Sequence, residues 1–119
     1  MAKLFGFGRE ERLRRPSEFK KVLSSGRRIV THHFIFYVYR KDEGKRRLGI
    51  SISRRVGGAA RRSRIKRLLR ETFRLEKAGL PEGIDMVAIV KDLKGIRGLE
   101  DVAGEFRAAL GSLDGEDDA

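Results

Sequence analysis

Hydrophobic and polar residues follow two different periods along this chain, and each period predicts one kind of element. Apolar residues spaced three and four positions apart predict helices, and three stretches show that spacing: Pro16–Ser25, Ala59–Lys77 and Leu99–Leu110. Runs rich in β-branched and aromatic residues predict strands, and three stretches have that composition: Ile29–Tyr39, Arg47–Ser53 and Ile84–Val90. The pattern therefore predicts the order α β β α β α around one sheet.

Breaker residues set the expected ends of these elements. Pro16 suits the first turn of a helix, and Gly26 stops the helix that follows it. Gly79 and Pro81 end the long helix. The polar residues 40–46 predict a hairpin loop between the first two strands.

The first two predicted strands differ in what their faces carry. Ile29–Tyr39 is apolar or aromatic on both faces, so either helices cover both faces or one face lines an open groove where unpaired bases can stack. Arg47–Ser53 has one apolar face for a core, and a small polar face that carries Gly49, Ser51 and Ser53. That second face either leaves room for an extended strand of nucleic acid or is simply solvated.

Net charge narrows the class of partner. The 119 residues carry a net charge of +11, and because the last six hold four acids and no base, residues 1–113 alone carry +15. A chain this basic predicts a polyanionic partner, with nucleic acid favoured over an anionic membrane. No apolar run approaches the roughly 20 residues that a spanning helix needs, and no signal-peptide pattern opens the sequence. We therefore expect no membrane partner and a cytoplasmic protein.

The stretch Arg54–Arg74 concentrates this charge on one side of the long predicted helix. Only Glu71 opposes its nine basic residues, which are Arg54, Arg55, Arg61, Arg62, Arg64, Lys66, Arg67, Arg70 and Arg74. At 100° per residue the apolar residues share one side and most of the basic ones share the other. An ordinary solvated helix mixes signs to gain support between residues i and i+4. The one-sided charge therefore favours a polyanion, and the alternative is a soluble cationic face without a partner.

The start of this helix carries charge of the unfavourable sign. A first helical turn prefers acidic residues, but here Arg61 and Arg62 follow Gly57-Gly58. A docked polyanion would offset the repulsion, since free N–H groups and guanidinium groups both bind phosphate. A second basic cluster precedes the first helix and consists of Arg12, Arg14 and Arg15.

The residues that a protein nuclease needs are missing from the pattern. His32 and His33 are adjacent on a predicted strand, so their side chains should point to opposite faces. The carboxylates are scattered, the chain has no Cys, and no Gly-rich loop for a nucleotide phosphate is present. The residues alone predict an RNA-binding protein with no catalytic residue and no small-molecule substrate.

We expect one folded domain with a flexible N-terminal segment and a disordered C-terminal tail. A chain of 119 residues is long enough for one modest core, and no repeat or linker divides it. We expect a single RNA-binding domain over residues 1–113, of which residues 1–11 are flexible. The acidic tail at residues 114–119 should be disordered.

Arg54–Arg74 resembles the signature of the bacterial ribonuclease P protein family. That signature has two basic residues, Val/Ile-Gly, a short connection, and then Arg-Asn-x-x-Lys-Arg-x-x-Arg-Glu-x-Phe-Arg. The lead-in matches at Arg54–Gly57, and the helical part matches in register at Arg62, Lys66, Arg67, Arg70, Glu71, Phe73 and Arg74. The resemblance spans residues 12–92, because further matches occur at Arg12-Leu13, Phe19, Val22, Phe34–Tyr37 and Leu48–Ser51.

One position departs from this signature. Ser63 stands where the family has Asn, so a shorter hydroxyl replaces an amide that both donates and accepts hydrogen bonds. In the family this region is linked to contacts with metal and RNA. Ser63 stays among the candidate RNA contacts, and no residue of the chain is assigned as a metal ligand.

The resemblance implies both a fold and a function. The fold is α+β, a two-layer α/β sandwich whose four-stranded sheet has flanking helices and a left-handed β-α-β crossover, as in the second domain of ribosomal protein S5. The function is that of the ribonuclease P protein subunit, in which a larger RNA subunit hydrolyses the phosphodiester with Mg²⁺. The protein would bind the 5′ leader of precursor tRNA, favour precursor over mature tRNA, and help the RNA to hold its metal ions.

The resemblance also implies two sets of site residues. The candidate RNA contacts are Arg12, Arg14, Arg15, Arg54, Arg55, Arg61, Arg62, Ser63, Lys66, Arg67, Arg70 and Arg74. The candidate leader cleft, between the sheet and the first helix, consists of Phe19, Val22, Tyr37 and Ser51. Some of the basic residues would contact the ribonuclease P RNA and others the leader, and the sequence leaves this division open.

Two competing interpretations share the same charge. One is a ribosomal or other structural RNA-binding protein that takes part in no nuclease complex. The other is a DNA-binding module that places the basic helix in a major groove. Rows of Arg without Asn or Gln on the cationic face fit phosphate contact better than base readout.

Overall fold

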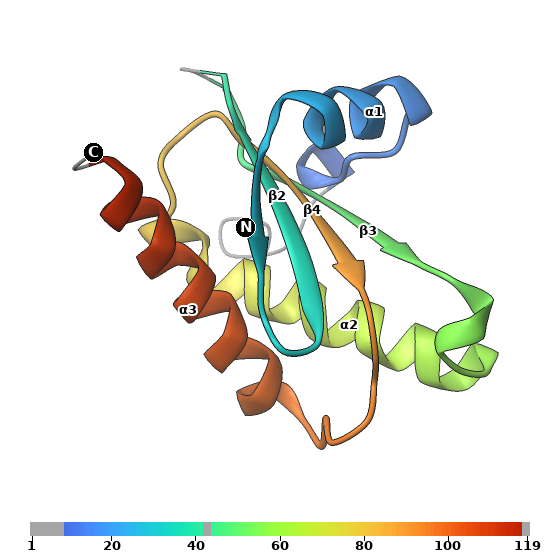
Figure 1. The fold of residues 1–119 in the computed structure, drawn as a ribbon. Helices are drawn as coiled ribbons and strands as arrows, with labels where there is room; N and C mark the ends of the chain where they lie inside the picture. The colour runs from blue at the N-terminus through green and yellow to red at the C-terminus, as the bar shows by residue number, and fades with distance from the viewer. Residues whose placement is uncertain (1–8, 42–43, 118–119) are drawn as a thin grey trace.

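The computed structural model describes residues 9–41 and 44–117, which form a four-stranded sheet and three α-helices (Figure 1). In chain order the elements are α1 (Pro16–Ser25), β1 (Arg27–Val30), β2 (Phe34–Arg40), β3 (Arg47–Ile52), α2 (Ala59–Glu76), β4 (Ile84–Val90) and α3 (Leu99–Asp117). Short 3₁₀ turns lie at Arg9–Glu11, Arg54–Val56 and Lys77–Gly79. The predicted positions of the three helices and of β3 and β4 are confirmed to within a residue or two, except that α3 runs on to Asp117.

The strands pair in the order β1-β2-β4-β3. The pairs β1–β2 and β2–β4 are antiparallel, and β3–β4 is parallel. Because β4 lies between β2 and β3, residues 40–46 do not form the hairpin that the sequence pattern predicted. Helix α2 connects the parallel pair, as in the β-α-β unit that the resemblance implied; its left-handed sense stays a prediction.

The predicted strand Ile29–Tyr39 is in fact two strands. A turn at residues 31–33 separates β1 from β2, and the Thr31 N–H donates to the Phe34 carbonyl at 2.8 Å. His32 and His33 therefore lie in a turn. The prediction that they point to opposite faces of one strand is wrong. Their rings are neighbours, with centroids 4.3 Å apart.

The larger core lies between one face of the sheet and helices α2 and α3. Phe36 of β2 and Phe73 of α2 both meet Phe106 of α3 edge-on, with ring centroids 5.8 and 6.4 Å apart. All three rings are buried, as is Met86 on β4. Such edge-on aromatic packing adds to the burial of apolar area, and it fixes α2 against the sheet.

A smaller core lies on the opposite face, under α1. Its buried residues are Leu13, Val22 and Val87. Gly49 on β3 allows this packing, because a Cβ at that position would come within 2.6 Å of the Phe19 ring. Gly49, one of the small residues that the alternation placed on this face, is therefore covered by Phe19 of α1, whereas Ser51 on the same face is exposed.

The described residues before α1 reach the edge of the sheet at β3. The residues before Arg12 that the structure describes form the turn at Arg9–Glu11, and Arg12 bridges to Leu48 of β3. Residues 1–8 of the segment predicted to be flexible, and residues 118–119 of the acidic tail, lie outside the described residues. No helix among the described residues is long and apolar enough to cross a membrane.

Gly49→Ala tests the contact between α1 and the sheet. The added methyl group must displace the Phe19 ring, so we expect a loss of about 1–3 kcal/mol in the free energy of unfolding, measured by urea denaturation. Gly104→Ala in α3 is the control, because nothing lies within 4 Å of its added Cβ and Ala favours a helix over Gly by about 1 kcal/mol. An unchanged stability for Gly49→Ala would contradict the packing described here.

Candidate RNA interface

Helix α2 is fixed on one side and basic on the other. Ile65, Leu69 and Phe73 are buried against the sheet and α3. Gly58 caps the helix without a side-chain hydrogen bond, and its first turn contains no acid. The local charge and capping therefore disfavour this helix end, and tertiary packing holds it in place.

Most of the predicted RNA contacts on and before α2 keep their positive charge uncompensated. Within residues 9–41 and 44–117, no acid forms an ion pair with the following basic residues: Arg54, Arg55, Arg61, Arg62, Lys66, Arg67 and Arg70. Arg54, Arg55, Arg61, Arg67 and Ser63 are exposed. Arg62 is half-buried and donates to the Gly57 carbonyl at 3.2 Å. These residues give α2 an outward positive field.

A groove brings the two predicted basic clusters together. It has a volume of about 170 Å³ and lies beside β3, where Arg12 and Arg14 of the first cluster face Lys66 and Arg70 of α2, with Phe19 of α1 in the wall. Burial lowers the pKa of Arg70, and the positive charge of Arg12 lowers it further. Like charges held this close favour binding of an anion between them.

Arg74 differs from the other predicted contacts. Its guanidinium forms an ion pair with Glu71 three residues earlier. The hydrogen bond to Arg74 lowers the pKa of the Glu71 carboxyl, and the same bond raises the pKa of Arg74. The Glu71 carboxylate thus offsets part of the charge of Arg74, and the role of Arg74 as an RNA contact stays a prediction. Arg15 is exposed beside α1.

The predicted leader cleft is partly open. Phe19 and Tyr37 are half-buried, and Ser51 is exposed. Tyr37 pairs with Val87 of β4, and Val87 pairs with Gly49, so Tyr37 lies on the sheet face that carries α1. Val22 is only 1% exposed and lies in the smaller core. The prediction that Val22 lines the cleft is therefore wrong. Val22 instead lies in the core against which Phe19 and Tyr37 pack.

An ion-pair network holds α1 over this face. Arg47 of β3 donates to Glu18 of α1 at 2.7 Å and to both carboxylate oxygens of the buried Asp85 at 2.8 and 2.9 Å. Burial alone would raise the pKa of Glu18, but hydrogen bonds from the Arg15 N–H, the Arg47 side chain and the Arg14 N–H lower it to about 2. The position of α1 beside β3, and with it the cleft, depends on this network.

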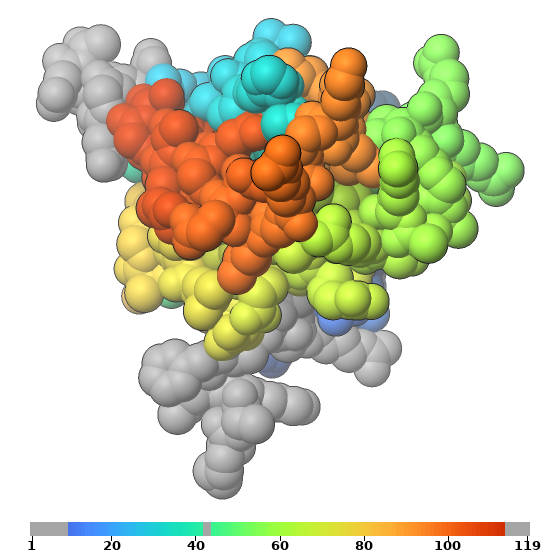
Figure 2. Space-filling model, turned by 90° about the horizontal axis from the view of Figure 1, so that it is seen from below, coloured from blue at the N-terminus to red at the C-terminus, as the bar shows by residue number. Residues whose placement is uncertain are grey.

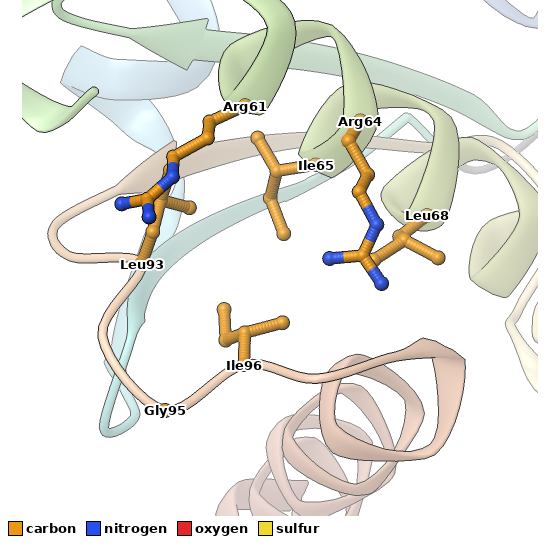
Figure 3. A pocket seen from close by; sticks show the side chains of 7 residues that line it. All are labelled: Arg61, Arg64, Ile65, Leu68, Leu93, Gly95 and Ile96. Atoms are coloured by element: carbon orange, nitrogen blue, oxygen red, sulfur yellow. The ribbon is translucent and has the colours of Figure 1, made fainter. Parts of the chain in front are cut away.

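A second pocket lies on the other flank of the buried stripe of α2. It has a volume of about 270 Å³ between α2 and the loop at residues 92–98. Figure 2 shows this side of the molecule, where the segment leading into α3 lies beside α2. Figure 3 shows Arg61 and Arg64 reaching toward the loop from two successive turns of α2, with Ile65 and Ile96 facing each other between them.

Side chains from three elements fix this loop. His33, in the turn between β1 and β2, is buried, and its ring Nε2 lies 2.6 Å from the Lys94 carbonyl, which can only accept. Its Nδ1 lies 2.5 Å from the Glu105 carboxylate of α3. Both ring nitrogens therefore donate, as in the protonated imidazole. Arg64 of α2 donates to the Arg97 carbonyl at 2.5 Å.

The charge of His33 follows from these partners. Burial opposes its protonation, but the hydrogen bonds to Glu105 and to the Lys94 carbonyl, with the negative charges of Glu105 and Asp92, raise its pKa. The pKa of Glu105 is lowered, because the same bonds outweigh its burial. Neither residue was selected from the sequence; two adjacent His residues carry no signal of which one meets an acid 72 positions away.

A model of the Ribonuclease P family matches residues 7–114. The chain belongs to the ribonuclease P protein family. It is 46% identical over 98 residues to the ribonuclease P protein component of Dictyoglomus thermophilum, and the aligned region covers 82% of this chain and 81% of that protein. The corresponding protein of Dictyoglomus turgidum is 41% identical over 98 residues, covering 82% of each chain.

Solved structures of family members have the same fold. The RNase P protein of Thermotoga maritima superposes with a TM-score of 0.73 at 28% identity, over 82% of this chain and 93% of that one. The fold is also that of the Staphylococcus aureus RNase P protein, with a TM-score of 0.76 at 24% identity, over 87% of this chain and 94% of that one. Family membership implies a ribonuclease P RNA as partner and a role in tRNA 5′ processing. It gives no support to the ribosomal or DNA-binding interpretations.

The raised pKa of His33 predicts how the free energy of unfolding of this protein depends on pH. A pKa raised above the unfolded value of about 6.5 means that protonated His33 stabilises the fold at low pH, and that this contribution is lost as pH rises through the folded pKa. We expect the free energy of unfolding, measured by urea denaturation, to fall as pH rises above the unfolded value of about 6.5 and through the raised folded pKa of His33. His33→Gln should remove most of this slope, whereas His32→Gln, at an exposed position, should keep it. A slope that survives in His33→Gln would contradict the assignment.

Proposed function

We propose that this protein binds the 5′ leader of precursor tRNA while it is bound to a ribonuclease P RNA, and that the RNA subunit performs the hydrolysis. The observation that carries the proposal is the groove beside β3. It combines the cations Arg12, Arg14, Lys66 and Arg70 with the ring of Phe19 in one concave surface. Phosphate contact and ring stacking together are how proteins bind single strands without reading their sequence.

The geometry of the sheet supports an extended ligand. The half-buried Tyr37 and the exposed Ser51 lie on the same face of the sheet, and α1 covers only part of that face. A single strand that follows this face would pass from the ring of Tyr37 to the cations of the groove. Paired RNA hides its bases in the stack and would use only the phosphate contacts. The site therefore favours an unpaired leader over the paired acceptor stem.

The chemistry of cleavage belongs to the RNA in this proposal. Among the described residues, no three His, Cys, Asp or Glu side chains gather into a group that could hold a metal ion. Ser63, which replaces the family Asn, is exposed and offers only a hydroxyl. Mg²⁺ would be bound mainly by the RNA subunit, where it supplies Lewis-acid chemistry. In this proposal the protein's residues hold the precursor tRNA and screen its phosphate charge. The complex needs no small-molecule substrate, and it works in the cytoplasm.

Tyr37→Ala tests the leader cleft directly. In a complex reconstituted with a bacterial ribonuclease P RNA, the wild-type protein should bind precursor tRNA more tightly than mature tRNA, and should speed 5′ cleavage at low Mg²⁺. Tyr37→Ala should weaken precursor binding by about 1–3 kcal/mol, the contribution of one stacked base, and leave mature tRNA binding unchanged.

Tyr39→Ala is the matched control for this experiment. Tyr39 lies two residues further along β2 on the same face, where its ring meets the Lys21 ammonium at 5.4 Å. It should keep the preference for precursor tRNA. Equal losses for precursor and mature tRNA in Tyr37→Ala would show that Tyr37 only packs. A wild-type protein that leaves cleavage by the RNA unchanged would refute the proposed function itself.

A further inference from the structure

We propose that the second pocket, between α2 and the loop at residues 92–98, takes one unpaired nucleotide of the ribonuclease P RNA. Its base would enter between Ile65 and Ile96, and Arg61 and Arg64 would bind the adjoining phosphates. This inference rests on the RNA partner that the proposed function assigns, and it concerns a different surface from the leader cleft.

The chemistry of the pocket selects the class of ligand. Its walls are aliphatic, from Ile65 and Leu68 of α2 and from Leu93 and Ile96 of the loop, and its charged lining residues are Arg61 and Arg64 (Figure 3). An apolar ligand would leave the positive charges of Arg61 and Arg64 without an anion, although Arg64 also donates to the Arg97 carbonyl. A bare phosphate would leave four aliphatic side chains without contact. A nucleotide has both an apolar ring and an anion, so it satisfies both halves of the pocket.

Size and position narrow the ligand further. A volume of about 270 Å³ lies just below the roughly 300–1,000 Å³ of sites that enclose a whole small molecule, so the pocket suits a single base with its sugar outside. The adjacent end of α2 has no side-chain cap and no acid in its first turn. Its free N–H groups add to the attraction that Arg61 exerts on a phosphate.

Hydrogen bonds hold the loop wall of the pocket in place without a ligand. Ile96 N–H donates to the Leu93 carbonyl at 3.1 Å, in a turn whose Gly95 has a φ of 91°. His33 holds the Lys94 carbonyl from the sheet side, and Arg64 holds the Arg97 carbonyl from α2. Because these bonds fix the wall, little conformational entropy is lost when a base enters.

The acids nearest to the loop do not oppose an anion in the pocket. Asp92 accepts from the Lys94 N–H at 3.0 Å, and Asp101 accepts from the Arg97 N–H at 2.7 Å. Backbone hydrogen bonds lower the pKa of both carboxyl groups, so both are ionised and directed at the loop backbone. Neither of them lines the pocket.

The place of the pocket favours the RNA subunit over the leader as the source of the nucleotide. On α2, Lys66 and Arg70 face the groove on one flank of the buried stripe, whereas Arg64 and Leu68 face the pocket on the other. A leader seated against Tyr37 and Phe19 lies on the first flank. A second RNA segment is needed to reach the second flank, and the large RNA partner supplies one.

Ile96→Trp tests the inference by filling the pocket without removing a charge. We expect the affinity of the full chain for a ribonuclease P RNA to fall about tenfold, because the base can no longer bury its apolar ring surface between Ile65 and Ile96. The dependence of affinity on salt and the preference for precursor over mature tRNA should stay as in the wild type. Leu75→Trp is the control, because Leu75 is 52% exposed near the end of α2 and lines neither concavity.

A second measurement uses the wild-type protein alone and does not depend on how Ile96→Trp folds. Adenosine monophosphate should shift the NMR methyl signals of Ile65, Leu93 and Ile96 in a saturable way, and ribose 5-phosphate should shift them much less. Equal shifts with ribose 5-phosphate or with inorganic phosphate would overturn the inference in favour of a simple anion site. Unchanged RNA affinity in a folded Ile96→Trp would also overturn it, while the precursor preference of that variant would show that the proposed function stands.

Discussion

The buried stripe of α2 is the constraint on which the rest of this structure depends. Ile65, Leu69 and Phe73 pack into the core between the sheet and α3, and this apolar contact holds the helix although its charges repel one another. Burial of side chains of this size contributes about 1.5–3 kcal/mol each, whereas exposed charge pairs contribute far less. The core can therefore support a helix whose basic side chains are directed at a partner.

The two flanks of α2 lie against different segments of the chain, because the sheet approaches the helix asymmetrically. On one flank, beside β3, the residues before α1 bring Arg12 to Lys66 and Arg70, and α1 adds the ring of Phe19. On the other, the loop that leads from β4 to α3 comes close to Arg61 and makes a second concavity. One helix thus presents two concave cationic surfaces, and its outermost residues lie between them. The proposed division between contacts with the leader and contacts with the RNA subunit follows these two surfaces.

The sequence predicted the elements whose signals are local. Helices α1 and α2 begin and end where Pro16, Gly26 and Gly79 indicated, and the row of basic residues on α2 followed from the helical period. The split between β1 and β2 was missed because Thr31–His33 contains none of the residues that usually mark a turn. The predicted hairpin at residues 40–46 was wrong because β2 pairs with β4, 44 or more positions further along the chain, and not with β3. The burial of Val22 and the pocket at Ile96 depend on tertiary packing, which the sequence pattern does not show. The ion pair of Arg74 with Glu71 is local, because the two residues lie three positions apart on α2.

The most direct test of the central claim, that the uncompensated charge of α2 binds RNA phosphate, is the salt dependence of RNA affinity for Arg67→Ala. Arg67 is exposed on the outer side of α2 and forms no ion pair with an acid among the described residues. Each lost phosphate contact should reduce the slope of log affinity against log salt concentration by about 0.7–0.9. Arg107→Ala, which removes an arginine already paired with Glu76 and Glu100, should leave the slope unchanged. The same slope for Arg67→Ala and the wild type would contradict the account.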